Sequence, residues 1–276
     1  LIDGGRRDEA VHSRRAIEIY SQLGDPEREA RVTINLGAVA YEEGRWDDAI
    51  DLYRRGAELS RRGGNLDVAA TGELNIGEIL SDQGRLSEAM TTLTHARRVY
   101  TSIGQKHGAA FATMLLGRLA VREGRYEDGR ALLEEAGDGL SSLNLAIYVG
   151  AAKAYLAEGE ALGGDPSTAL AMADRLLSLD NRNVALLRRV RAIALIRLGR
   201  SDPAVGELER SLEAASFSGT DYDTAAALDL LVALGVLVSG VEERDAILER
   251  LHVGWLPRPA ALVGAAERDM FSRAIA

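Results

Sequence analysis

The chain has 276 residues, of which 46% are hydrophobic and 27% charged, a balance typical of a globular protein with a buried core. Aromatic residues make up only 5%, which favours helices over sheets. The formal net charge of −9 argues against a nucleic-acid-binding surface across the molecule, because phosphate binding needs a sustained positive potential. The absence of cysteine excludes disulfides, thiolate zinc sites and a cysteine nucleophile.

No segment is expected to enter a membrane. The longest apolar stretch, residues 224–238, contains Asp229 and is too short to span a bilayer comfortably. Nothing resembles a signal peptide, and the chain begins with "LIDGG" rather than Met. We therefore expect a cytoplasmic protein and a portion of a longer polypeptide.

In chain order, the first regular feature is a glycine that recurs every 40 residues. One series holds Gly44, Gly84, Gly124 and Gly164, and a second, offset by half a repeat, holds Gly24, Gly64, Gly104 and then Asn144. Glycine and asparagine tolerate the left-handed backbone that follows a helix C-terminus. The pattern predicts that a helix ends about every 20 residues.

Between these ends the apolar residues have helical spacing, as over residues 34–41 and 49–57. Each repeat is therefore predicted to be two antiparallel helices of about 16 to 18 residues. Asp25 before Pro26 and Asp165 before Pro166 are predicted N-caps.

Small residues recur where the two helices of a pair should touch. Close approach of helices requires short side chains, so these positions are predicted contacts. They are Gly37, Gly77 and Gly117 on the first helices, and Ala49, Ala89 and Gly129 on the second.

The segment "NLGAVAYEEGRWDDAIDLYRRGAEL" (35–59) resembles the tetratricopeptide repeat, in its long 40-residue form. The resemblance implies an all-α fold, a right-handed α-solenoid of antiparallel helix pairs. It covers residues 1–216, with a truncated first copy that includes Gly4 and Ala10. Residues 217–253 are predicted to form a C-terminal helical pair capping the array. Residues 254–276 are predicted to be a tail or a short capping helix, because Pro257 and Pro259 cannot continue a helix.

Three further stretches, 75–89, 107–125 and 243–259, resemble the C-terminal repeat region of large bacterial signalling proteins. In those proteins a class III adenylate or guanylate cyclase module and an AAA-type ATPase module precede the repeats. Transcriptional regulators with an ATPase module before similar repeats are the alternative. Either resemblance implies a regulatory module that binds proteins.

No catalytic or metal-binding motif is found. Neither lysine lies in a phosphate-binding loop, and GxGxxG and GxSxG are absent. The four histidines have no metal-ligand spacing and are interpreted as ordinary surface residues. We expect no cofactor, no metal and no enzymatic activity in this chain; an enzyme would require a buried polar constellation that the sequence does not reveal.

The resemblance implies a concave groove lined by the first helix of each pair, which accepts an extended peptide. A side-chain carboxamide can pair with the main chain of such a peptide, so Asn35 and Asn75 are either peptide ligands or caps of neighbouring backbone. The remaining predicted groove residues are Ile34, Ala38, Glu42, Leu74, Glu78, Asp82, Met114, Arg118 and Arg122.

An arginine cluster follows within residues 182–200. Arg188, Arg189, Arg191 and Arg197 are interpreted either as a docking patch for an acidic partner or as side chains neutralised by acids such as Glu207 and Glu209. Trp46 either plugs the turn between its helices or binds ligand.

The sequence thus predicts a protein-interaction module whose partner is a peptide or a neighbouring domain of the same polypeptide, with no nucleic acid or membrane partner. The alternative is a self-association scaffold, which an uncovered apolar patch over 225–238 would favour.

Overall fold

The computed structural model describes residues 13–179, 183–218, 221–236, 240–259 and 262. Within these ranges the regular structure is helical and contains no strand, which confirms the predicted all-α class. The truncated first repeat, with Gly4 and Ala10, lies outside the described residues, as does most of the predicted tail.

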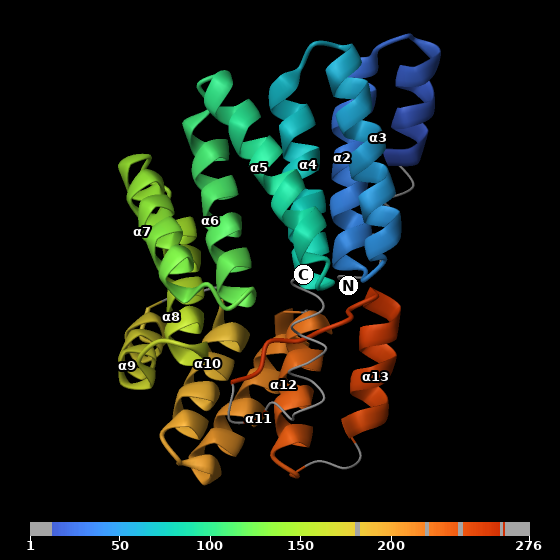
Figure 1. The fold of residues 1–276 in the computed structure, drawn as a ribbon. Coiled ribbons are helices and arrows are strands. Elements are labelled where there is room, and N and C mark those ends of the chain that lie inside the picture. Colours follow the sequence, from blue (N-terminus) through green and yellow to red (C-terminus); the bar gives the residue numbers. More distant parts are fainter. Residues whose placement is uncertain (1–12, 180–182, 219–220, 237–239, 260–261, 263–276) are drawn as a thin grey trace. The chain divides into compact units, whose positions relative to one another are not determined.

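In unit 1, the helices of the first pair, α2 (Pro26–Glu42) and α3 (Trp46–Arg62), are joined by a tight turn and lie side by side (Figure 1). Residues 13–22 are helical. The following helices are α2 (Pro26–Glu42), α3 (Trp46–Arg62), α4 (Leu66–Asp82), α5 (Leu86–Ser102), α6 (Lys106–Arg122), α7 (Tyr126–Ser142), α8 (Ala146–Leu162), α9 (Pro166–Leu177), α10 (Val184–Arg197), α11 (Ser201–Ser218), α12 (Asp221–Ala233) and α13 (Gly240–Leu251). Seven of these, α2 to α8, have 17 residues each, within the predicted length.

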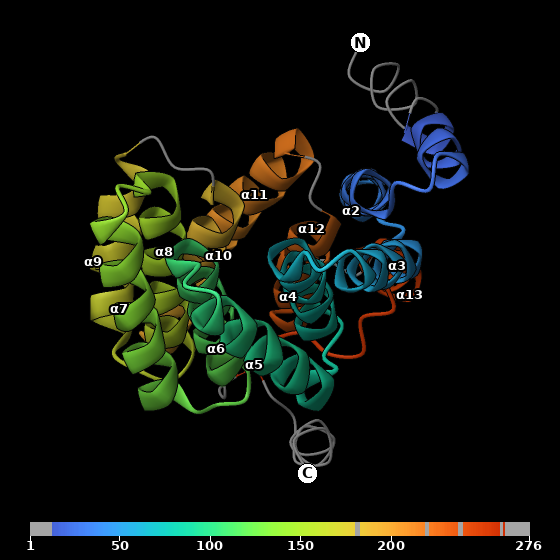
Figure 2. The same ribbon diagram turned by 90° about the horizontal axis from the view of Figure 1, so that it is seen from above.

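The chain forms two compact units. Unit 1 comprises residues 1–81 and 88–112, and unit 2 comprises residues 82–87 and 113–276. In unit 2, α7, α8 and α9 are neighbours in both views (Figure 2). The helices α12 and α13 fall within residues 217–253 and pack on each other. The boundaries predicted at 216/217 and 253/254 stay predictions.

The turn positions follow the predicted series. Six glycines from Gly24 to Gly124 have φ between 65° and 80°, and Asn144 has φ 58°. Gly164 departs from the pattern: α8 ends at Leu162, its C-cap residue Gly163 has φ −139°, and Gly164 is not left-handed. There the Glu160 carboxylate accepts a hydrogen bond from the Asp165 amide at 2.9 Å, so a side chain replaces the glycine turn.

The recurrent glycines do mark close helix contacts. A Cβ at Gly37 would lie 2.8 Å from the Tyr53 ring, and one at Gly77 would lie 2.5 Å from Leu93 Cδ2. Ala49 and Ala89 are fully buried on the partner helices. The short side chains therefore let the helices of a pair pack closely.

Both predicted N-caps form. The Asp25 carboxylate accepts a hydrogen bond from the Arg28 amide at 3.1 Å, and that of Asp165 accepts from the amides of Ser167 and Thr168. Trp46 is buried and stacks on Tyr41 with ring centroids 5.7 Å apart, in keeping with its interpretation as a plug between α2 and α3.

Candidate functional site

In unit 1 the predicted groove residues are exposed to different degrees. On α2, Asn35, Ala38 and Glu42 are exposed, whereas Ile34 is buried in the core. On α4, the side chains at 74, 75 and 78 are half-buried. The burial of Ile34 corrects its place in the predicted groove. Its physical reason is the close approach of α3, where a Cβ at Gly56 would lie only 2.5 Å from Ile34 Cγ1.

Tyr53 joins the two helices of this surface. Its hydroxyl and the Asn75 side chain form a hydrogen bond. Burial raises the pKa of Tyr53, and the negative charges of Glu78 and Glu42 raise it further. Asn75 therefore bonds a side chain of the same protein, which is neither of the two partners considered from the sequence, a peptide main chain or neighbouring backbone. The carboxylates of Glu78 and Glu42 make the surface around it acidic.

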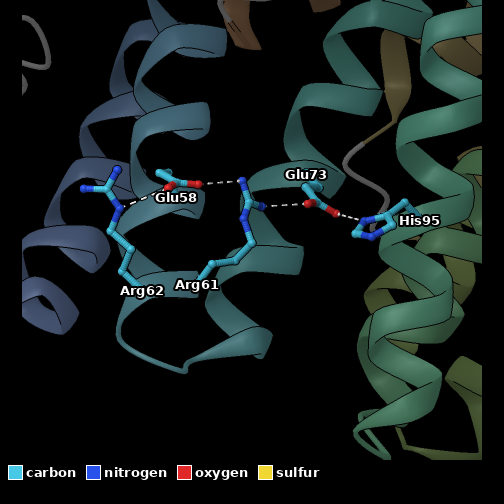
Figure 3. Close-up of polar contacts among 5 residues, drawn as sticks. All are labelled: Glu58, Arg61, Arg62, Glu73 and His95. Atoms are coloured by element: carbon cyan, nitrogen blue, oxygen red, sulfur yellow. Dashed lines mark hydrogen bonds and ion pairs between the residues drawn. The ribbon is translucent and has the colours of Figure 1, made fainter.

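A second set of charged residues in unit 1 ties α3, α4 and α5 together (Figure 3). Arg61 pairs with Glu58 at 3.4 Å and with Glu73 at 2.9 Å, and Glu73 also contacts His95 Nδ1 at 2.5 Å. The His95 side chain is 59% exposed, as expected for a surface histidine. Because Arg61 and His95 are exposed, these pairs contribute little to stability.

In unit 2 the predicted groove residues are buried. Asp82 Oδ1 lies 3.3 Å from Arg118 Nη1 and 2.5 Å from Arg122 Nη2, and all three residues are at most 8% exposed. Met114 is buried as well. This corrects the expectation of exposed arginines in the groove. The physical reason is that the start of α12 covers them: Arg122 Nη2 donates a hydrogen bond to the Tyr222 hydroxyl at 3.1 Å.

Arg189 joins the same cluster, although the sequence placed it in a separate patch. Its Nη1 donates to Asp223 at 2.6 Å, and its Nη2 lies 3.6 Å from Glu158. The side chain is 2% exposed. We define the inner charge cluster as Asp82, Arg118, Arg122, Glu158, Arg189, Tyr222 and Asp223.

The electrostatics of the inner charge cluster keep its arginines charged. Burial by itself lowers the pKa of Arg118, but the negative charge of Asp82, with smaller contributions from Tyr155, Glu158 and Tyr222, raises it well above the usual value. The guanidinium of Arg118 also lies over the Tyr155 ring, 4.5 Å from its centroid. Arginine bears only donors, so the cluster is suited to hold anionic groups.

Several buried polar atoms in the inner charge cluster have no hydrogen-bond partner within the described part of the chain. Among them are Arg118 Nε, Glu158 Oε2 and Arg189 Nη2. Buried polar groups are normally satisfied, and an unsatisfied one destabilises the fold. The start of α12 therefore does not provide a hydrogen-bond partner for every buried polar atom of the cluster.

The other predicted patch residues are bound by neighbouring helices. Arg188 pairs with Glu207 at 3.1 Å, and Arg191 pairs with Glu207 at 3.3 Å and also with Asp174. Arg197 donates to the carbonyls of Glu160 and Ala161, the last turn of α8. The alternative of arginines neutralised by acids thus describes Arg188 and Arg191, with Glu207 as their shared acid.

Sequence reasoning missed the part played by the C-terminal residues. Arg258 forms two hydrogen bonds to the buried carboxylate of Asp229, and the Gly254 amide donates to the Gln83 carbonyl at 3.0 Å. The Gln83 side chain in turn donates to the Leu251 carbonyl at 3.1 Å. These contacts hold α12 and α13 over the inner charge cluster.

One sequence signal was available for the inner charge cluster. Glu78, Arg118 and Glu158 are 40 residues apart and so occupy one position in successive repeats, with alternating charge. The contributions of Tyr222 and Asp223 had no such signal, because they come from a helix outside that series.

Within the described residues, no group of three or more potential ligand residues could hold a metal ion, and no helix is long and apolar enough to cross a membrane. Residues 225–231 are buried, so the apolar patch invoked for self-association is covered over that stretch.

The helix pairs and the interior-facing polar residues define a helical-repeat protein. The family model described as "Soluble NSF attachment protein, SNAP" matches residues 14–160, more than half of the chain. The chain therefore belongs to the soluble NSF attachment protein family.

Three solved structures with a similar fold are complexes with a peptide or with Competence and Sporulation Factor. The Rap conjugation gene regulator of plasmid pLS20, in complex with the Phr* peptide, has a TM-score of 0.69 at 15% identity and covers 84% of this chain. This chain spans 66% of that regulator's length. A comparison with curated protein sequences found no match.

Two further structures cover nearly the whole chain. NprR in complex with its cognate peptide NprX has a TM-score of 0.68 at 13% identity, covering 98% of this chain and 86% of NprR. A Rap protein complexed with Competence and Sporulation Factor has a TM-score of 0.62 at 13% identity, covering 97% and 84%. At these identities the likeness establishes the tetratricopeptide-like helical-repeat fold alone.

Proposed function

We propose that this chain is the protein-interaction module of a larger bacterial signalling or transcription-regulating protein in the cytoplasm. It captures a peptide segment or a neighbouring domain on the first helices of its pairs, and occupancy biases an attached output module. The attached module, a nucleotide cyclase or an ATPase by the sequence resemblance, belongs to the same proposal. Peptides in the complexes of Rap and NprR support it, since those proteins share this fold.

The observation that carries the proposal is the polar surface shared by α2 and α4. Asn35 and Glu42 remain exposed on α2, whereas Leu36 and Ala40 of the same helix are buried. Glu78 on α4 lies close enough to Tyr53, together with Glu42, to raise the pKa of that residue. Two carboxylates and an exposed carboxamide offer recognition of an extended basic segment.

Binding rather than catalysis is also the better account of the inner charge cluster. Its arginines keep their protons at physiological pH, so they stabilise negative charge but do not exchange protons. Asp82 and Asp223 are each paired with an arginine at 2.5 and 2.6 Å. The cluster therefore recognises anions. The alternative function, self-association, required an uncovered apolar patch, and residues 225–231 of that patch are buried.

The proposal is tested by selecting peptides from a displayed random library on the immobilised chain. We expect enrichment of Lys- and Arg-containing peptides, and about tenfold or greater weakening when Glu42→Gln and Glu78→Gln are combined, because each lost ion pair removes attraction at the surface. The matched control is Asp51→Asn on α3, whose carboxylate is 77% exposed and pairs with Arg54 in a surface contact at 2.8 Å.

Selected peptides that bind the parent and the double variant equally would refute the proposed surface. Equal weakening by Asp51→Asn would show an effect of net charge rather than of the α2–α4 surface.

A further inference from the structure

The inner charge cluster is closed by residues of the chain itself. Tyr222 and Asp223 lie in the first turn of α12, and they contact Arg122 on α6 and Arg189 on α10. Arg122 and Tyr222 are 100 residues apart, so this contact does not arise from stacking of neighbouring repeats. The contacts place the Tyr222 ring and the Asp223 carboxylate against arginine side chains of α6 and α10. Both are first helices of a pair, and first helices are where a captured segment is expected to bind in this fold.

We propose that Tyr222 and Asp223 are a built-in occupant of a binding site for a protein segment that carries an aromatic residue followed by an acid. Such a segment replaces the start of α12 on Arg122 and Arg189. This inference rests on the proposed capture of segments by first helices, and it specifies the partner chemistry in unit 2.

The geometry supports exchange in two ways. The Tyr222 ring lies under the Arg122 guanidinium, 5.4 Å from carbon to centroid, and the Asp223 carboxylate pairs with Arg189, so the two recognition elements are consecutive in sequence. Arg118 Nε and Arg189 Nη2 remain without hydrogen-bond partners in the described residues. A segment that satisfies these donors gains contacts that the built-in occupant does not make.

The C-terminal contacts set how firmly the occupant is held. Asp229 on α12 is 3% exposed and is bound by Arg258 through two nitrogens. Both lie outside the inner charge cluster. Because a bidentate pair of this kind orients its partners, it keeps the start of α12 at a high local concentration over the arginines.

The probe is a fluorescein-labelled peptide that reproduces residues 219–230, GTDYDTAAALDL, with binding to the full chain followed by fluorescence anisotropy. A tethered occupant competes at an effective concentration of about a millimolar, so the parent chain should bind the probe weakly. Combining Tyr222→Ala with Asp223→Asn vacates the arginines and should strengthen binding by about tenfold or more. Adding Arg189→Gln to that variant should abolish the gain.

Two controls separate specific exchange from general loosening. Asp202→Asn removes an exposed carboxylate at the start of α11 and should leave the affinity of the probe unchanged. A probe with asparagine at the position of Asp223 should lose most of its affinity for the vacated variant. Circular dichroism verifies that each variant is folded.

A second measurement uses the unmodified chain and is independent of the variants. Hydrogen exchange of residues 221–233 should speed up in the presence of saturating probe, because the start of α12 leaves its site. Equal affinity of the parent and the vacated variant, binding that survives Arg189→Gln, or unchanged exchange in α12 with probe bound would each overturn the inference.

The outcome is distinguishable from that of the library selection on Glu42 and Glu78. If library peptides depend on those carboxylates while the probe does not exchange with α12, only the built-in occupant is refuted. If neither result appears, the proposed function is refuted as well.

Discussion

The Arg122 guanidinium donates a hydrogen bond to the Tyr222 hydroxyl at 3.1 Å, across 100 residues of sequence. Both side chains are buried, and burial raises the pKa of Tyr222 while the positive charge of Arg122 counteracts it. The contact binds the end of α6 to the start of α12 and so closes the inner charge cluster.

We expect Tyr222→Phe to lower the free energy of unfolding by about 1–3 kcal/mol, because it removes one acceptor of a buried charged donor while keeping the ring. Urea denaturation followed by circular dichroism measures the change. An unchanged midpoint would mean that Arg122 finds another acceptor.

Arg189→Leu should be one of the most destabilising substitutions of a charged residue in unit 2. It leaves Glu158 and Asp223 without their arginine, and breaking a buried ion pair typically costs about 3–5 kcal/mol. The matched control is Arg54→Leu on the surface of α3, where the pair with Asp51 is 63% and 77% exposed and about 0–1 kcal/mol is expected. Similar losses for both variants would contradict the burial of the inner charge cluster.

Gly77 and Gly137 should respond in opposite directions to alanine. A Cβ at Gly77 would meet Leu93 Cδ2 at 2.5 Å, and overpacking of this kind costs about 1–3 kcal/mol. A Cβ at Gly137, inside α7, meets nothing within 4 Å, so Gly137→Ala should stabilise by about 0.5–1 kcal/mol through helix propensity. Thermal unfolding of the two variants gives the comparison; stabilisation by both would show that α4 and α5 are not tightly packed.

Gly104 should be intolerant of alanine for a backbone reason alone. Its φ is +73°, and a Cβ there would meet nothing within 4 Å, so strain is the only cost. We expect Gly104→Ala to destabilise by about 1–2 kcal/mol. Gly104→Asn should cost less, because Asn144 adopts φ 58° at the equivalent turn. Equal losses in urea denaturation would argue against the left-handed turn.

The N-cap of α9 should make stability depend on pH in the acid range. Hydrogen bonds from the Thr168 hydroxyl and the amides of Thr168 and Ser167 lower the pKa of Asp165 below its usual 3.8. Since the folded pKa is the lower one, the cap contributes fully above pH 3.8, and its contribution is lost as the pH falls through the folded pKa. Unfolding free energies of the parent chain and of Asp165→Asn should therefore converge as the pH falls below that value. A difference that stays constant between neutral pH and pH 2 would refute the lowered pKa.

Much of the helical architecture could be predicted because its determinants are local. Gly44 and Gly84 end helices through backbone conformation, and Asp25 begins one by accepting a hydrogen bond three residues ahead. Such features act within one turn of chain, so their spacing in the sequence indicates where helices begin and end. Gly164 was misread because a carboxylate, that of Glu160, took over the turn.

Part of the candidate site was visible in the same way. The 40-residue period placed Asn35, Glu42 and Glu78 on first helices, and the structure leaves their side chains exposed or half-buried on unit 1. Periodicity identifies the face of a helix, and the next element of the solenoid decides whether that face stays accessible.

For Arg118, Arg122 and Arg189, accessibility was decided by tertiary structure alone. The sequence by itself determined that these arginines lie on first helices, since helical spacing is a property of neighbouring residues. Only the fold determined that Tyr222 and Asp223 cover them, because that contact joins helices that are far apart along the chain. The arginines predicted to line an open surface are therefore buried and paired with carboxylates. A buried guanidinium group needs such a partner because water no longer solvates its charge.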